Sequence, residues 1–88
     1  MKKELQQYEV VVLTAVSKHV RPWAGKDQPQ EGDKAVVLEV LQSPKLMYEL
    51  ECSDENGATK WIVKMEQKDF RFRRFFGSNS ENDPAESK

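Results

Sequence analysis

The sequence predicts a small, mainly β domain, and three observations lead to that prediction. Short segments rich in β-branched residues alternate apolar and polar side chains, which is the period of a half-buried strand. Turn signals built from glycine, proline and asparagine separate these segments. No segment has an apolar repeat long enough for an amphipathic helix to compete. The length of 88 residues suits one domain with one modest core.

The first strand is predicted at residues 8–16, where the sequence reads YEVVVLTAV. Residues 1–7 before it are expected to form a polar N-terminal arm. Residues 17–33 after it contain two prolines, two glycines and no sustained period, so we expect a long ordered loop there. A loop of this length is uncommon in a compact domain and is often functional.

Three strands are predicted to follow as a meander, at residues 34–42, 46–52 and 59–67. The sequence SPK at 43–45 is expected to turn the chain between the first two. The segment 53–58 contains Asn-Gly, which is the strongest hairpin signal in the chain because both residues tolerate a positive φ angle. Alternation along each strand then divides its side chains between a buried and a solvent-facing side.

The positions of the meander that are expected to face the core are Val36, Leu38, Val40, Tyr48, Leu50, Cys52, Trp61, Val63 and Met65. Glu49 and Glu51 would then lie on the outer face beside Lys60 and Lys64, where pairs of opposite charge help to set the register. The net charge of −1 hides an acidic block followed by a basic block along the chain, which supports this pairing.

The end of the chain is predicted to close the sheet. We expect a short 3-10 turn at residues 67–70 and a brief final strand at residues 70–74, which read FRFRR. Phe70 and Phe72 would face inward while the arginines face outward. Residues 77–88 contain no aliphatic side chain larger than alanine, so we expect a disordered polar tail.

The predicted order is strand, long loop, three-stranded meander, single turn and short strand. This is the layout of an SH3-like barrel, and we therefore predict a five-stranded barrel over residues 8–76. A closed sheet suits a chain that is too short to fill two layers.

Three stretches also match a known family, namely YEVVVLTAV at 8–16, EGDKAVVLEVL at 31–41 and YELECSDENGATKWIVKMEQKDF at 48–70. Through them, residues 8–72 resemble a family of short bacterial SH3-like proteins known only as a domain of unknown function. The resemblance implies the barrel fold and implies no catalytic residues, because the family has none that are agreed. The chain departs from the family pattern in its long loop and its Arg/Phe-rich end, where we expect its individual function.

An enzymatic function is not expected. The chain has one histidine, His19 in the loop, and one cysteine, Cys52 on an inward-facing strand position, so no Cys–His nucleophile pair is predicted. The strand carboxylates lie opposite lysines. A nearby positive charge stabilises the ionised carboxylate and lowers its pKa, whereas a general acid has to be protonated. We find no cluster of metal ligands and no cofactor motif, and therefore expect neither a metal nor a cofactor.

The N-terminal residues do not have the pattern of a signal peptide, because charged and polar side chains interrupt the short apolar run. No stretch approaches the ~18 apolar residues that a membrane helix needs. The expectation is a cytoplasmic protein.

The loop is the first candidate binding region. His19, Arg21 and Trp23 place an aromatic side chain beside proline and basic groups, a composition that protein interfaces favour. The competing interpretation is that Trp23 folds back and caps one open end of the barrel.

The end of the last strand is the second candidate region, comprising Arg71, Arg73, Arg74, Phe75 and Phe76. Arg74 interrupts the alternation of phenylalanine and arginine, so at least one of the last two phenylalanines is expected to be exposed.

The function expected from these features is that of a non-enzymatic protein-binding module, such as an accessory subunit, an immunity protein or an antitoxin. The alternative is a KOW-like nucleic-acid-binding barrel that uses the long loop and the arginines of the last strand. A net charge of −1 gives nucleic acid little electrostatic attraction, so a protein partner is favoured and no membrane partner is expected.

Overall fold

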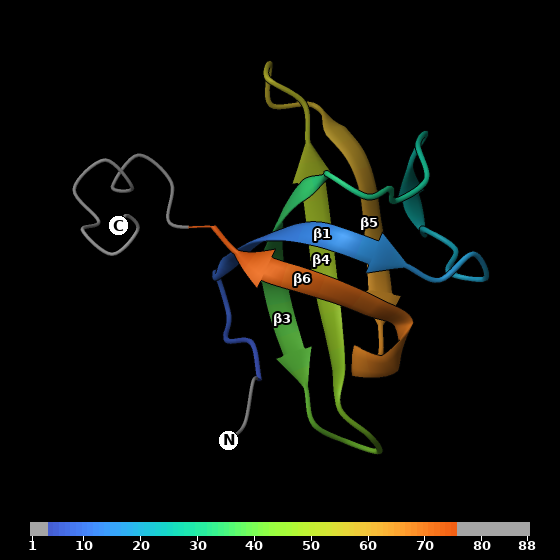
Figure 1. The fold of residues 1–88 in the computed structure, drawn as a ribbon, viewed down its shortest axis with the longest axis vertical. Helices are drawn as coiled ribbons and strands as arrows, with labels where there is room; N and C mark the ends of the chain where they lie inside the picture. The colour runs from blue at the N-terminus through green and yellow to red at the C-terminus, as the bar shows by residue number, and fades with distance from the viewer. Residues whose placement is uncertain (1–3, 76–88) are drawn as a thin grey trace.

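The computed structural model describes residues 4–75, which form one antiparallel sheet of six strands with one short 3-10 turn, η1 (Figure 1). The elements are β1 (Val10–Val16), β2 (Ala24–Gly25), β3 (Lys34–Leu41), β4 (Met47–Ser53), β5 (Thr59–Met65), η1 (Gln67–Asp69) and β6 (Phe70–Arg74). Their order in the sheet is β2-β5-β4-β3-β1-β6. The predicted tail at 77–88, Phe76 and the first three residues of the predicted arm lie outside the described residues.

The structure confirms a small, mainly β fold with a single 3-10 turn, but it differs from the prediction in the number of strands. Each of the five predicted strands is present to within two residues of its predicted bounds. The additional strand, β2, is a two-residue pairing inside the predicted loop at 17–33. A strand this short has no alternation of apolar and polar residues, and its sequence therefore gave no signal.

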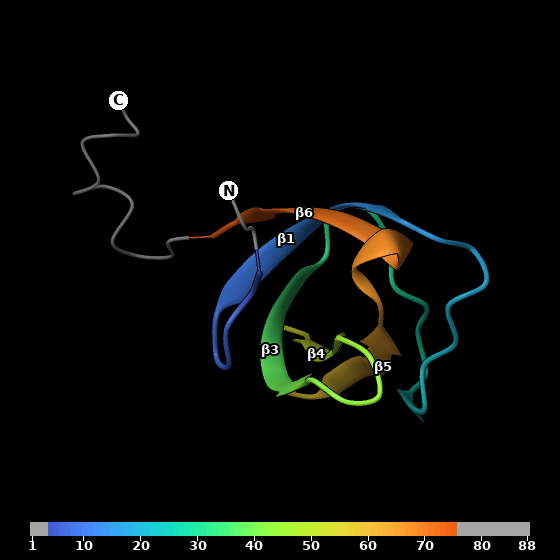
Figure 2. The same cartoon turned by 90° about the horizontal axis from the view of Figure 1, so that it is seen from below.

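The sheet is strongly curled (Figure 2). β3 belongs to both halves of the curl, because residues 34–36 pair with β1 and residues 36–41 pair with β4. β1 and β6 consequently lie across the other strands, as both views show. The edge strands β2 and β6 share no ladder among the described residues, so the five-stranded closed barrel that the sequence predicted is replaced by a six-stranded open sheet.

The core is filled from both halves of the sheet, and Trp61 and Tyr48 are its largest fully buried side chains. The Trp61 indole N–H donates to Asp33 Oδ2 at 2.9 Å, and the Tyr48 hydroxyl accepts from the Leu5 amide at 3.2 Å, so both polar atoms are satisfied. Leu5, which the sequence placed in a polar arm, is therefore part of the core. The remaining buried apolar residues are Val11, Leu13, Val20, Ala35, Val37, Leu50, Cys52, Val63, Met65 and Phe70.

The inward face of β3 differs from the prediction. Ala35 and Val37 are buried. Val36 and Leu38, which were predicted to face the core, are half-buried. The ladder with β4 slips by one residue just after Val37, and this bulge returns Val40 to the inner side, where it packs against the core. The prediction was wrong because it placed the larger side chains inward, and a one-residue bulge leaves no signal in the apolar pattern.

The outer face of β4 and β5 shows the predicted charge pairing only in part. Glu49 lies directly opposite Lys64 in the ladder. Lys60 instead places its Nζ 3.6 Å from Asp33 Oδ1, which belongs to the end of the long loop. The lysines of β5 therefore lie near acidic side chains of two kinds, one on the neighbouring strand β4 and one at the end of the loop.

Candidate functional site

The long loop is held to β5 by backbone pairing through β2. The amide of Trp23 donates to the Ile62 carbonyl at 2.9 Å, and the amide of Asp27 donates to the Lys60 carbonyl at 2.9 Å. Gly25 lies between them with φ at 90°, and a Cβ at this position would lie 2.3 Å from the Lys60 carbonyl oxygen. Only glycine permits so close an approach of the two backbones.

Asp33 anchors the far end of the loop. Its Oδ2 accepts hydrogen bonds from the Trp61 indole at 2.9 Å and from the Gln30 amide at 3.0 Å. Its Oδ1 lies 3.6 Å from Lys60 Nζ, and its carbonyl accepts from the Leu13 amide at 2.8 Å. One residue therefore connects the loop to the core, to β5 and to β1.

Trp23 remains exposed even though the loop around it is firmly held. Its exposed fraction is 61%. The indole N–H donates to Glu49 Oε2 on β4 at 2.9 Å, and the amide pairs with Ile62 on β5. Backbone and ring are both tethered, so the ring is presented to solvent in one orientation. The interpretation in which Trp23 caps the barrel is wrong, because a capping ring would be buried; its role in partner binding stays a prediction.

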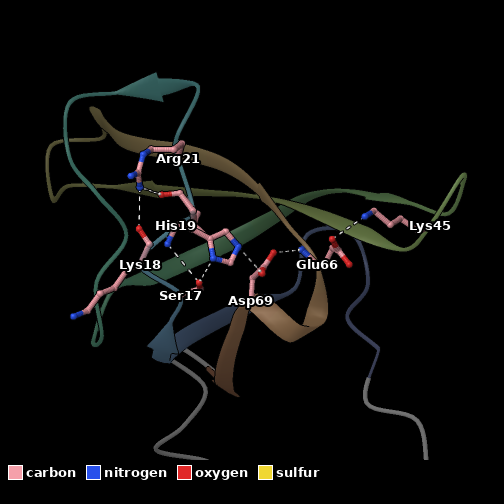
Figure 3. A network of polar contacts seen from close by, with 8 residues as sticks. Ser17, Lys18, His19, Arg21, Lys45, Glu66 and Asp69 are labelled. Atoms are coloured by element: carbon pink, nitrogen blue, oxygen red, sulfur yellow. Dashed lines mark hydrogen bonds and ion pairs between the residues drawn. The ribbon is translucent and has the colours of Figure 1, made fainter.

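His19 links the start of the loop to the turn before β6 (Figure 3). Its Nδ1 lies 2.6 Å from Ser17 Oγ, and its Nε2 lies 3.3 Å from Asp69 Oδ1. Both contacts are satisfied when the serine hydroxyl donates to Nδ1 and the Nε2–H donates to the carboxylate. Asp69 is only 8% exposed and also accepts from the Glu66 amide at 3.0 Å. The histidine thus connects an exposed loop to a buried carboxylate.

Ser17, His19 and Asp69 have the same order of hydrogen-bond donors and acceptors as the catalytic triad of a serine hydrolase. An acyl-transfer site also needs amide donors directed at the reacting oxygen. Here the Ser17 amide donates to the Asp69 carbonyl at 2.7 Å, and the His19 amide is directed at Ser17 Oγ at 3.4 Å. Both of these amides are engaged in the turn, and the contacts of the three side chains connect the loop to η1.

Arg21 stabilises the same turn from its other side. Its Nη1 donates to the carbonyl of Lys18 at 2.9 Å and to that of Val20 at 3.1 Å (Figure 3). Gln28 Nε2 donates to the same Val20 carbonyl at 3.2 Å. Arg21 is exposed, but one of its nitrogens is committed to the conformation of the loop.

The first four side chains of β6 divide between core and solvent as predicted. Phe70 is buried with its ring edge-on to Tyr48 at a centroid separation of 6.2 Å, and Phe72 is half-buried beside it. Arg71 and Arg73 are exposed and form no ion pair within the described part of the chain. Phe70 and Phe72 therefore serve the core, and Arg71 and Arg73 face solvent.

The last two described residues are engaged within the molecule. Arg74 forms an ion pair with Glu9 and donates to the Glu4 carbonyl at 3.1 Å. Phe75 is half-buried, and Lys34 Nζ lies 4.4 Å from the centroid of its ring. Both side chains already have partners, which weakens their predicted roles in binding phosphate and stacking on bases.

The predicted site residues lie in three places rather than in one. Trp23 is at the β2 edge of the sheet. His19 contacts Asp69 of η1, next to an open depression of about 240 Å³ that Arg71 helps to line. Arg74 and Phe75 lie at the opposite end of β6.

Several residues that organise these regions were missed by sequence reasoning. Asp33 and Glu49 read as ordinary surface charges, and Asp69 read only as part of a turn. Their partners are distant in sequence, since Asp33 bonds to Trp61 28 residues away, so no local pattern reveals them. Tyr8 was placed in the first strand, yet it is 70% exposed with φ at 71°, and β1 begins two residues later.

Two titratable groups outside the loop, Cys52 and Lys45, have raised pKa values. Burial, with a smaller contribution from the Asp33 carboxylate, raises the pKa of the Cys52 thiol, which therefore stays protonated at neutral pH. The hydrogen bond to Glu66, at 2.9 Å, raises the pKa of the Lys45 ammonium group. Among the described residues, no three His, Cys, Asp or Glu side chains are grouped so as to hold a metal ion. The same part of the chain contains no helix long and apolar enough to cross a membrane.

Comparisons of the chain with protein-family models, with curated proteins and with solved structures found no match. Its function has to be argued from the residues described above.

Proposed function

We propose that this chain is a non-enzymatic binding module, built on a curled, SH3-like sheet, and that its partner is a protein. The observation that carries the proposal is the exposed Trp23, tethered by its backbone to β5 and by its indole to Glu49. Tryptophan is enriched among the residues that dominate protein interfaces. A ring that is already held in one orientation loses little conformational freedom on binding, so more of its contact energy is available as affinity.

The SH3-like part of the proposal is supported by the arrangement of the strands. β3 is shared between two halves of a curled antiparallel sheet, and a 3-10 turn directly precedes the last strand. The resemblance of residues 8–72 to a family of short bacterial SH3-like proteins points in the same direction. In SH3-like proteins the long first loop flanks the ligand groove, and Trp23 belongs to the corresponding loop of this chain.

The loop also exposes polar side chains apart from this anchor. His19 and Arg21 are exposed on the same loop, and each is held by at least one hydrogen bond. A partner that contacted these side chains as well as Trp23 would meet the combination of aromatic and polar groups that protein interfaces favour. Cytoplasmic accessory subunits, immunity proteins and antitoxins of bacteria are the classes of small protein that fit such a module.

A pull-down from the native lysate tests the proposal, with the wild-type chain and Trp23→Ala compared after nuclease treatment. The wild type is expected to retain one stoichiometric protein that survives nuclease and moderate salt, and Trp23→Ala is expected to lose it. Tyr8→Ala, which removes a second strongly exposed aromatic side chain of the described residues, is the matched control and should retain the partner. Retention of the partner by Trp23→Ala would overturn the proposal.

Nucleic acid is the second candidate partner, and the observation that favours it is the pair of exposed arginines Arg71 and Arg73, which have no ion pair within residues 4–75. Arg74 and Phe75 support it less, because one is paired with Glu9 and the other is covered by Lys34. Captured components that disappear on nuclease treatment, with binding that falls steeply as salt is added, would favour this candidate over a protein partner.

A further inference from the structure

β6 has an open backbone edge. In the described part of the chain it is the last strand of the sheet and pairs only with β1. The Phe75 amide donates to the Val10 carbonyl, and the register slip between the two strands lies in β1, so the alternation along β6 is regular. The backbone groups of Phe72 and Arg74 therefore point away from β1. An exposed edge of this kind is a template for pairing with a further strand.

The two sides of the sheet beside this edge differ in chemistry. On the outer side, Arg71 and Arg73 are exposed and have no ion pair among the described residues. Phe72 points to the opposite side and is half-buried. An open depression of about 320 Å³ beside the edge is lined by Phe70 and Phe72 together with Gln67, Lys68 and Arg71. The edge thus combines free backbone groups, exposed arginines on the outer side and a half-buried phenylalanine ring on the inner side.

This combination selects among possible occupants. A second copy of β6 paired with the same edge would place arginines opposite arginines, which is destabilising. A strand with acidic side chains on its outer side would instead place carboxylates opposite Arg71 and Arg73. Apolar side chains at the alternate positions of that strand would lie over Phe72 and the depression beside it.

We propose that the open edge of β6 binds an extended, acidic segment of a partner protein by strand addition. Main-chain hydrogen bonds to alternate residues of β6 would supply affinity, and the arginines and the half-buried ring of Phe72 would select the sequence. The inference rests on the proposed function, because it takes the partner to be a protein. It assigns that partner a second contact, separate from the one at Trp23.

The probe for this contact is a short synthetic peptide that alternates glutamate and valine and is blocked at both ends. It is titrated into the full-length protein, and binding is followed by fluorescence anisotropy and by amide chemical shifts. We expect saturable binding that weakens with added salt, with the largest shifts at Phe72 and its neighbours in β6. The double variant Arg71→Glu and Arg73→Glu should weaken binding about tenfold or more. Lys18→Glu, a single charge reversal at an exposed loop residue, should leave binding unchanged.

Two further peptides separate charge from backbone pairing. One replaces glutamate by lysine, and the other carries N-methyl groups at its valines, whose amides would face β6. Loss of binding by both supports strand addition. Equal binding of the N-methylated peptide, or wild-type affinity of the double arginine variant, would overturn it. Trp23→Ala should leave peptide binding intact. The peptide therefore tests the contact at β6 independently of the proposed anchor at Trp23. Loss of peptide binding in this variant would overturn the assignment to β6.

Discussion

The two regions that contain the candidate binding residues use their aromatic side chains in opposite ways. In the loop at 17–33, polar contacts hold the chain in place and the aromatic ring of Trp23 faces solvent. In β6, the ring of Phe70 is buried while Arg71 and Arg73 face solvent. The loop is stabilised by hydrogen bonds and presents an apolar group, whereas β6 is stabilised by apolar burial and presents charges. In each region, the side chains available for binding are those that folding does not use.

Phe70→Ala should give the largest loss of stability, because it removes apolar contact from the core. The ring is 5% exposed and packs edge-on against Tyr48. The cavity left behind is expected to lower the free energy of unfolding by about 3 to 4 kcal/mol. In a small domain with a stability on the order of 5 kcal/mol, that leaves a barely folded protein. Urea unfolding followed by tryptophan fluorescence measures the change.

Arg71→Ala is the matched control on the same strand, and it is expected to change the free energy of unfolding by less than about 0.5 kcal/mol. Comparable losses for Phe70→Ala and Arg71→Ala would contradict the division of β6 into a buried aromatic side and a free basic side.

Gly25→Ala tests how the loop is held and should cost about 2 kcal/mol, because the residue adopts a positive φ angle and the new methyl group would meet the Lys60 carbonyl. Displacement of β2 from β5 should also speed hydrogen exchange of the Trp23 amide, which donates to the Ile62 carbonyl. Gly57→Ala is the control, since its φ is also positive but the added methyl group meets no atom within 4 Å. Its cost should be that of backbone strain alone, about 1 kcal/mol, and equal costs would mean that close packing of β2 is unimportant.

The sequence predicted β6 better than it predicted the loop, and the reason is physical. Alternation along a strand is a local property, so the inward and outward residues of β6 can be read from their neighbours. The loop is held by contacts between distant residues: Trp23 bonds to Glu49 26 residues away, and Asp33 bonds to Trp61 28 residues away. Residue preferences along the chain do not encode such pairs, so the loop could be recognised as long and ordered, but the choice between an exposed and a capping Trp23 stayed open.

The errors within the sheet have the same origin. The inserted residue that forms the bulge after Val37 reverses which side chains of β3 face the core, and only the pairing with β4 reveals it. Leu5 reads as one apolar residue in a polar segment, yet its amide reaches Tyr48 43 residues away and its side chain is buried. Local pattern is sufficient for strand positions, but tertiary pairing decides the register and the edges.

Asp33→Ala should cost about 1.5 kcal/mol, because it leaves the buried indole N–H of Trp61 without its acceptor. The same change removes the contact with Lys60 and so loosens the far end of the loop. Asp33→Asn is the matched control: it keeps an acceptor for the indole and should lose distinctly less stability. Chemical denaturation and the fluorescence of Trp61 report the two effects. Equal losses for both substitutions would show that charge, rather than the hydrogen bond, is what Asp33 contributes.

Trp23→Ala should have the smallest effect on folding, a change of less than about 0.5 kcal/mol in the free energy of unfolding, because the ring is mostly exposed and forms one surface hydrogen bond. The same substitution should weaken partner binding by about 2 kcal/mol or more if the ring is an anchor. The free energy of unfolding and the affinity for the captured partner have to be measured on the same preparation. The test is whether the substitution weakens binding much more than it weakens folding. A loss of stability as large as that of Phe70→Ala would place Trp23 among the structural aromatic residues, and the contrast between the loop and β6 would no longer hold.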